Sequence, residues 1–93
     1  MNIFIMKKIN FQDFKIYTSV SHAKSVSLDV REKFADMIYQ GVNGIKAHSL
    51  AFKIYGSEGE TEYEDGELEL IRSVAEQMCV PGFIDGLNEQ TGE

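Results

Sequence analysis

The chain has few of the residues that mark a disulfide scaffold or a secreted protein. Its 93 residues contain one cysteine, one proline and no tryptophan. A single cysteine excludes a disulfide within the chain and is typical of a reducing compartment, so we expect a cytoplasmic protein. No apolar run approaches the roughly 20 residues that a membrane-spanning helix needs, so we expect no membrane association.

The first residues do not read as a signal peptide. The apolar stretch 1–6 is too short for a signal core, and its lysines follow it instead of preceding it. Met6 begins a sequence typical of a bacterial start. We therefore interpret residues 1–5 as an extension, and leave open whether they are native.

Basic residues are scarce in the second part of the chain. Residues 1–56 carry eight bases and four acids, a net +4, whereas residues 57–93 carry one base, Arg72, and eleven acids, a net −10. Such a split indicates a surface that meets a partner or an oppositely charged part of its own chain. The overall charge of −6 argues against nucleic-acid binding, because DNA-binding surfaces concentrate lysine and arginine.

Length and composition indicate one small domain. The hydrophobic fraction of 43% and the charged fraction of 26% are ordinary for a globular protein. We predict a single domain over residues 1–93. Residues 1–7 and 90–93 are expected to be loosely ordered, as chain ends often are.

A β-hairpin is predicted after the first strand-like residues. Phe14, Ile16, Thr18 and Val20 alternate with polar residues, and residues 25–28 alternate as well, which is typical of strands. The linker between them is short enough for a hairpin loop. Whether residues 3–9 add a third strand stays open.

Four helices are predicted to follow. Asp29 and Glu32 fit a capping box, and Val30, Phe34, Met37 and Ile38 form an apolar stripe. Gly41 is expected to end this helix with a positive φ, and Asn43 to cap a second helix, whose buried stripe ends before Gly56. The residues of that second stripe are Ala47, Leu50, Ala51 and Ile54.

The third helix is predicted to begin at Glu64 or Asp65, where acids favour a helix N-terminus. Pro81 suits the first turn of a fourth helix. The expected architecture is therefore an α+β fold, an N-terminal β-hairpin packed on three to four short helices in the order ββαααα. We expect the first helix to share a core with the hairpin. In that core, Phe34 and Ile38 should pack on Ile16, Val26 or Leu28.

The first two helices contain a near repeat. Residues 34–39 match residues 50–55 in the pattern large apolar, Ala, two variable positions, Ile, Tyr, at a spacing of 16. Duplication is one interpretation. The simpler one is that both helices need a small alanine for close approach, an aliphatic residue for the core and a tyrosine at the rim.

Residues 57–69 contain seven acids, but no metal-binding pattern. An EF-hand loop needs Gly at position 6 and Glu at position 12. Gly59 and Gly66 both fail this test, so we predict no metal. We interpret the segment as a solvated acidic surface, or as a partner interface in which an aromatic side chain anchors a basic partner. The interface residues would be Glu60, Glu62, Tyr63, Glu64 and Asp65.

No catalytic or cofactor-binding motif is present. Cys79 lies between apolar residues and is interpreted as an unreactive thiol, and His22 and His48 lack the spacing of a zinc site. The glycine pairs at 41–44 and 56–59 match neither the G-x-G-x-x-G dinucleotide-binding pattern nor the P-loop. We therefore expect no cofactor and no enzymatic activity.

The helical frame resembles a group of small uncharacterised proteins encoded in prophage or conjugative regions of bacterial genomes. The matching residues are 29–32, 35–39, 50–59, 67–71 and 83–85. The resemblance implies no catalytic residue and suggests an accessory or assembly protein of a mobile element.

Three hypotheses follow. The preferred one is a non-enzymatic protein-interaction protein that docks on a larger component, and a homodimer stays open. The alternative is an acidic nucleic-acid mimic that inhibits a DNA-binding protein, and Gly59 and Gly66 argue against the rigid face that a mimic needs. The third is a small enzyme.

Overall fold

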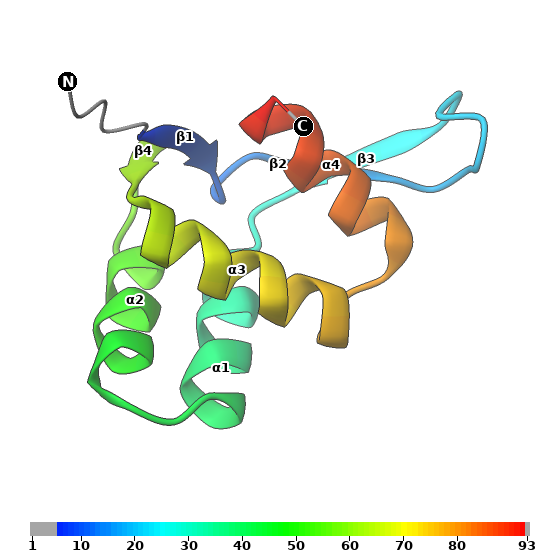
Figure 1. The fold of residues 1–93 in the computed structure, drawn as a ribbon. Coiled ribbons are helices and arrows are strands. Elements are labelled where there is room, and N and C mark those ends of the chain that lie inside the picture. The colour runs from blue at the N-terminus through cyan, green and yellow to red at the C-terminus, as the bar shows by residue number, and fades with distance from the viewer. Residues whose placement is uncertain (1–5, 93) are drawn as a thin grey trace, which may run out of the picture.

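The computed structural model describes residues 6–92 and has the predicted α+β architecture (Figure 1). A β-hairpin is followed by four helices, and a second pair of strands adds to this order. The elements are β1 (Lys7–Asn10), β2 (Phe14–Tyr17), β3 (Ser25–Leu28), α1 (Arg31–Gly41), α2 (Ile45–Tyr55), β4 (Glu60–Tyr63), α3 (Asp65–Met78) and α4 (Pro81–Thr91). The helices α1 and α2 stand side by side, α3 crosses this pair, and α4 lies with the strands beyond it.

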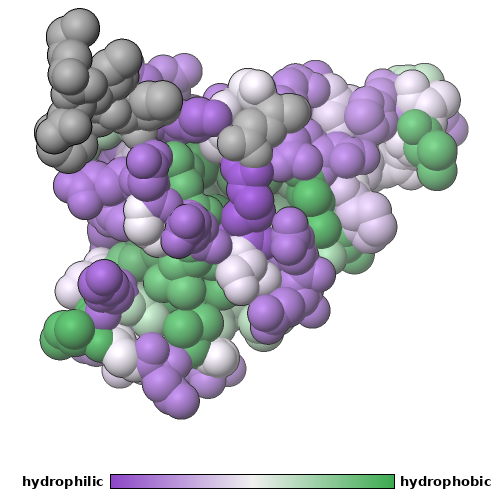
Figure 2. Space-filling view, viewed as in Figure 1, coloured by the Kyte–Doolittle hydropathy of each residue, from purple (hydrophilic) through white to green (hydrophobic). Residues whose placement is uncertain are grey.

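The predicted hairpin is present but shorter than the alternation suggested. Strands β2 and β3 pair antiparallel, with Phe14 opposite Leu28 and Tyr17 opposite Ser25. The strand ends at Tyr17, so Thr18 and Val20 lie in the loop, and Val20 is fully exposed. Figure 2 shows apolar surface at the tip of this projecting hairpin.

The acidic segment contains a strand that we did not predict. Strand β4 pairs antiparallel with β1 in a separate two-stranded sheet, which places Lys8 opposite Glu62 and Lys7 opposite Tyr63. Residues 7–9 thus form a strand, but it joins β4 and not the hairpin. Residues 3–5 lie outside the described residues. Lys7 is the first residue of β1, and Gln90 and Thr91 are the last residues of α4.

Stacked aromatic rings form the centre of the core. Phe34 packs on Phe11 with ring centroids 5.2 Å apart and on Phe83 at 5.4 Å, and Phe14 stacks on Phe83 at 4.3 Å. The expected burial of Phe34 is therefore confirmed. Of the neighbours predicted for it, Ile16 packs against this core, whereas Val26 and Leu28 lie on β3, every residue of which is exposed. The contacts of α1 with this core are made instead by Phe11, in the loop before β2, and by Phe83, on α4.

The local helix predictions hold for the later helices and fail at the start of α1. Glu64 and Glu67 form a capping box at α3, and Pro81 is the first residue of α4. At α1 the N-cap is Val30, and Asp29 instead accepts hydrogen bonds from the backbone and side chain of Arg31. At the turn into α2, Gly44 takes the positive φ, 108°, that we had placed at Gly41.

Helix α4 packs its glycine face directly on the backbone of β2. A β-carbon added at Gly82 would lie 1.8 Å from the carbonyl oxygen of Tyr17, and one at Gly86 would lie 1.9 Å from that of Lys15. No side chain fits in such a gap. The C-terminal end of α4 is also held, since Gln90 accepts a hydrogen bond from the Asn10 amide and Thr91 is buried.

Candidate functional site

The predicted acidic interface is only partly a surface. Glu60, Glu62, Glu64 and Asp65 are exposed, but the side chain of Tyr63 is completely buried. The alternation of β4 turns Glu60 and Glu62 outward and Tyr63 inward. The prediction that Tyr63 anchors a partner is therefore wrong.

Burial also changes the chemistry of Tyr63. Its hydroxyl group has no hydrogen-bond partner within residues 6–92, and desolvation raises its pKa to about 12. Nearby Ser57 opposes this rise in the pKa, and its own hydroxyl donates a hydrogen bond to the carbonyl oxygen of Ile54. The Nζ of Lys53 lies 4.7 Å from the ring centroid. Tyr63 is thus a neutral core residue.

Some of the oppositely charged residues in the two parts of the chain pair with each other. The basic first part of the chain packs on the acidic second part at several places: Lys53 pairs with Glu67 at 2.9 Å, and Lys15 with Glu89 at 3.6 Å. In the sheet, Lys8 lies opposite Glu62. These pairs leave less unbalanced charge for a partner than the sequence alone suggested.

One group of these contacts fastens the hairpin to α4. The hydroxyl of Tyr17 donates to the Glu89 carboxylate, and His22 contacts Asp85 at 3.0 Å while its ring stacks on that of Tyr17. The hydrogen bond from Tyr17, with help from Lys15, lowers the pKa of Glu89. This arrangement orders an otherwise marginal hairpin.

The structure does not bring Cys79 and a histidine together as a nucleophile and base. The Cys79 thiol is half-buried beside the sulfur of Met37, 3.8 Å away, and burial raises its pKa. His22 lies on the hairpin, and His48 lies on α2 beside Phe52. The geometry needed for thiolate chemistry is absent from these three residues.

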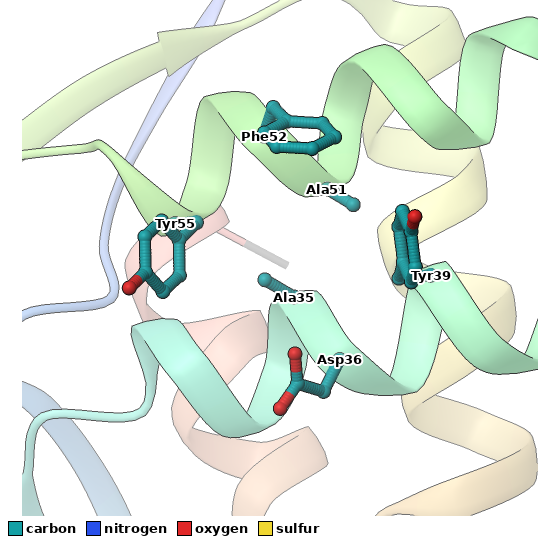
Figure 3. Close-up of a pocket in the computed structure, with 6 residues that line it drawn as sticks. All are labelled: Ala35, Asp36, Tyr39, Ala51, Phe52 and Tyr55. Atoms are coloured by element: carbon teal, nitrogen blue, oxygen red, sulfur yellow. The ribbon is translucent and has the colours of Figure 1, made fainter.

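An open depression lies between α1 and α2, on the side of the helix pair away from α3 and α4 (Figure 3). We call it the α1–α2 groove. It is a depression of about 180 Å³ lined by Ala35, Asp36, Tyr39, Ala51, Phe52 and Tyr55.

Aromatic rings wall the groove over a floor of methyl groups. The buried alanines, Ala35 and Ala51, form the floor, and Figure 3 shows a tyrosine at either end. Tyr39, Phe52 and Tyr55 are 58%, 57% and 59% exposed. The rings of Tyr39 and Phe52 are nearly perpendicular, at 88°, with centroids 6.0 Å apart. Such exposed aromatic clusters are typical of interfaces.

An acidic side chain completes the rim. Asp36 projects from α1 on the side of the groove opposite Phe52. Its carboxylate is exposed and makes no hydrogen bond or ion pair within residues 6–92. It therefore contributes an uncompensated negative charge beside three aromatic faces.

The near repeat explains how the sequence builds this groove. The paired alanines allow the two helices to approach closely, and the paired isoleucines enter the core. The paired tyrosines, Tyr39 and Tyr55, end up exposed at the two ends of the groove. We had interpreted the repeat either as a duplication or, more simply, as the packing needs of two helices with a tyrosine at the rim of each. Asp36 and Phe52 follow the two alanines at equivalent positions of the repeat. This equivalence was the one feature of the sequence that could have indicated a surface shared by the two helices.

Other kinds of site are not evident in the part of the chain that the structure describes. There, no three His, Cys, Asp or Glu side chains gather as metal ligands. None of the helices within residues 6–92 is long and apolar enough to cross a membrane. Comparison of the chain with protein-family models, curated proteins and solved structures finds no match.

Proposed function

We propose that this protein is a non-enzymatic interaction domain that binds a protein partner through the α1–α2 groove. The observation that carries the proposal is the trio of aromatic rings, each more than half exposed, over a buried alanine floor. Because these rings lie largely in solvent, packing of the core does not explain why aromatic residues occupy these positions. Exposed tyrosine and phenylalanine provide large contact areas at small cost in side-chain entropy.

The proposal includes an accessory or assembly role, in the cytoplasm, of the kind that mobile-element proteins perform. Its support is the resemblance of the helical frame, together with the lone free thiol of Cys79. The alternative of a nucleic-acid mimic has less support. Lys8 lies opposite Glu62, so positive charge interrupts the acidic face that would imitate phosphates.

Site-specific photo-crosslinking tests the partner role. A benzoylphenylalanine placed at position 52, in cells of the organism that encodes the protein, should give a discrete heavier adduct. The same group at Gln77, which is exposed on α3 outside the groove, is the matched control. Tyr39→Ala should weaken the adduct at position 52.

The outcomes separate the hypotheses. An adduct to one protein from position 52 alone supports the proposal. Equal labelling from both positions, or none from position 52, overturns it. An adduct with the mass of two copies of this chain would replace the partner role with a homodimer.

A further inference from the structure

The chemistry of the α1–α2 groove matches a cation better than an apolar side chain. Aromatic rings carry negative charge on their faces, and a cation within about 6 Å of a ring centroid is attracted to it. Here three rings and the free carboxylate of Asp36 surround one depression. No positively charged side chain lines it.

The cationic side chains within residues 6–92 do not fill the groove. Arg31 is the guanidinium nearest to Tyr55 along the surface, since both line the adjoining depression. Its nitrogens are occupied, because they donate to both carboxylate oxygens of Asp29 and to the carbonyl oxygen of Ser57. Lys33 lies one helical turn before Asp36 without forming an ion pair to it in the described structure.

The size of the groove limits its occupant to one side-chain head group. Its volume of about 180 Å³ is below the roughly 300–1,000 Å³ of pockets that hold small-molecule ligands. The groove is also open, as the exposure of its rings shows. Such a site receives a side chain that a larger partner presents.

We propose that the α1–α2 groove binds the guanidinium group of an arginine presented by the protein partner. Guanidinium is planar, so it stacks on an aromatic face such as Phe52. Its fork of donors also matches the two oxygens of Asp36. Lysine has neither feature, and its ammonium group is more strongly hydrated. The net charge of −6 favours the approach of such a basic partner.

The proposal rests on the proposed function but has its own test. Protein labelled with carbon-13 at alanine methyl groups is titrated with Nα-acetyl-arginine amide and followed by NMR. Ala35 and Ala51 report from the groove floor. Their resonances should shift and saturate with arginine amide, shift less with the lysine analogue, and stay unchanged with the citrulline analogue, which has the shape of arginine without the charge.

Variants identify the residues responsible. Because an exposed cation–π contact or ion pair is modest, Phe52→Leu and Asp36→Asn should each weaken the apparent affinity by about two- to fivefold. Asp13→Asn is the matched control, since it removes the same charge from an exposed acid in the turn before β2. It should leave the affinity unchanged.

Several results would overturn the arginine site. They are equal shifts with arginine and citrulline, shifts confined to methyl groups outside the groove, and equal weakening by Asp36→Asn and Asp13→Asn. Failure here is distinguishable from failure of the partner role. A crosslink from position 52 without arginine-dependent shifts would support the protein partner and overturn the arginine site. Arginine-dependent shifts without a crosslink keep the site and remove the protein partner.

Discussion

Lys53 and Glu67 join the two oppositely charged parts of the chain across α2 and α3. The Nζ of Lys53 lies 2.9 Å and 3.1 Å from the two carboxylate oxygens of Glu67. The same carboxylate accepts a hydrogen bond from the backbone amide of Glu64 at 2.9 Å. One side chain thus caps α3 and holds α3 to α2, and the two roles can be separated by substitution.

Glu67→Gln should cost less stability than Glu67→Ala. Glutamine retains an oxygen for the Glu64 amide and loses only a partly exposed ion pair, which contributes about 0.2–1 kcal/mol. Alanine also loses the cap, which contributes about 1 kcal/mol more. Urea denaturation measures both, and Glu69→Gln is the control for charge alone. Equal losses for the two variants would contradict the capping role.

Gly86→Ala should destabilise the protein severely. Its β-carbon would lie 1.9 Å from the Lys15 carbonyl oxygen, so α4 would have to move off β2. Overpacking of this kind typically costs about 1–3 kcal/mol, and occasionally more. The matched control is Gly66→Ala in α3, where nothing lies within 4 Å of the added carbon. That change should stabilise the helix by up to about 1 kcal/mol. Similar midpoints for both variants in urea would mean that α4 does not pack as described.

Sequence patterns predicted the elements whose causes are local. The start of α3 depends on Glu64 and Glu67, three residues apart, and the start of α4 on the fixed φ of Pro81. The stripe of α2 was also correct, because helical spacing alone decides which face is apolar.

Features that depend on distant residues escaped prediction. The strand β4 forms because β1, about fifty positions earlier, supplies its hydrogen bonds, and its alternation was hidden by its acidic composition. The burial of Tyr63 follows from that pairing. The groove forms only when α1 and α2 pack at a particular separation. The paired alanines allow that separation, but the groove could not be predicted from them alone. No helical pattern revealed that Gly82 and Gly86 face a strand backbone.

Phe34→Ala and Phe52→Ala make the same chemical change in the core and in the groove. Phe34 is 1% exposed and stacks between Phe11 and Phe83, so its loss should cost about 3–5 kcal/mol. Phe52 is exposed, and its loss should change stability by no more than about 0.5 kcal/mol. Chemical denaturation with circular dichroism distinguishes the two. A large loss for Phe52→Ala would show that the groove aromatics support the fold, which would weaken their assignment to a partner.

Tyr63→Phe should leave the protein as stable as the native chain, or more stable, near neutral pH. The substitution removes a buried hydroxyl that has no hydrogen-bond partner among the described residues, and such a group costs free energy when buried. The ring, which packs edge-on to Phe11 at 5.8 Å, is retained. A loss above about 1 kcal/mol would indicate that the hydroxyl is bonded in solution.

The free energies of unfolding of the native protein and of Tyr63→Phe should differ at high pH. The pKa of Tyr63 is raised from 10.0 to about 12 on folding, so the folded state holds this proton more tightly than the unfolded state. The resulting stabilisation is fully present below pH 10 and is lost as the pH rises through about 12. The native protein should therefore lose more stability than Tyr63→Phe over that window, by at most about 2–3 kcal/mol. Lysine titration affects both proteins alike, so the difference between their unfolding free energies isolates the tyrosine. Parallel pH profiles would show that Tyr63 reaches solvent and ionises like an exposed phenol.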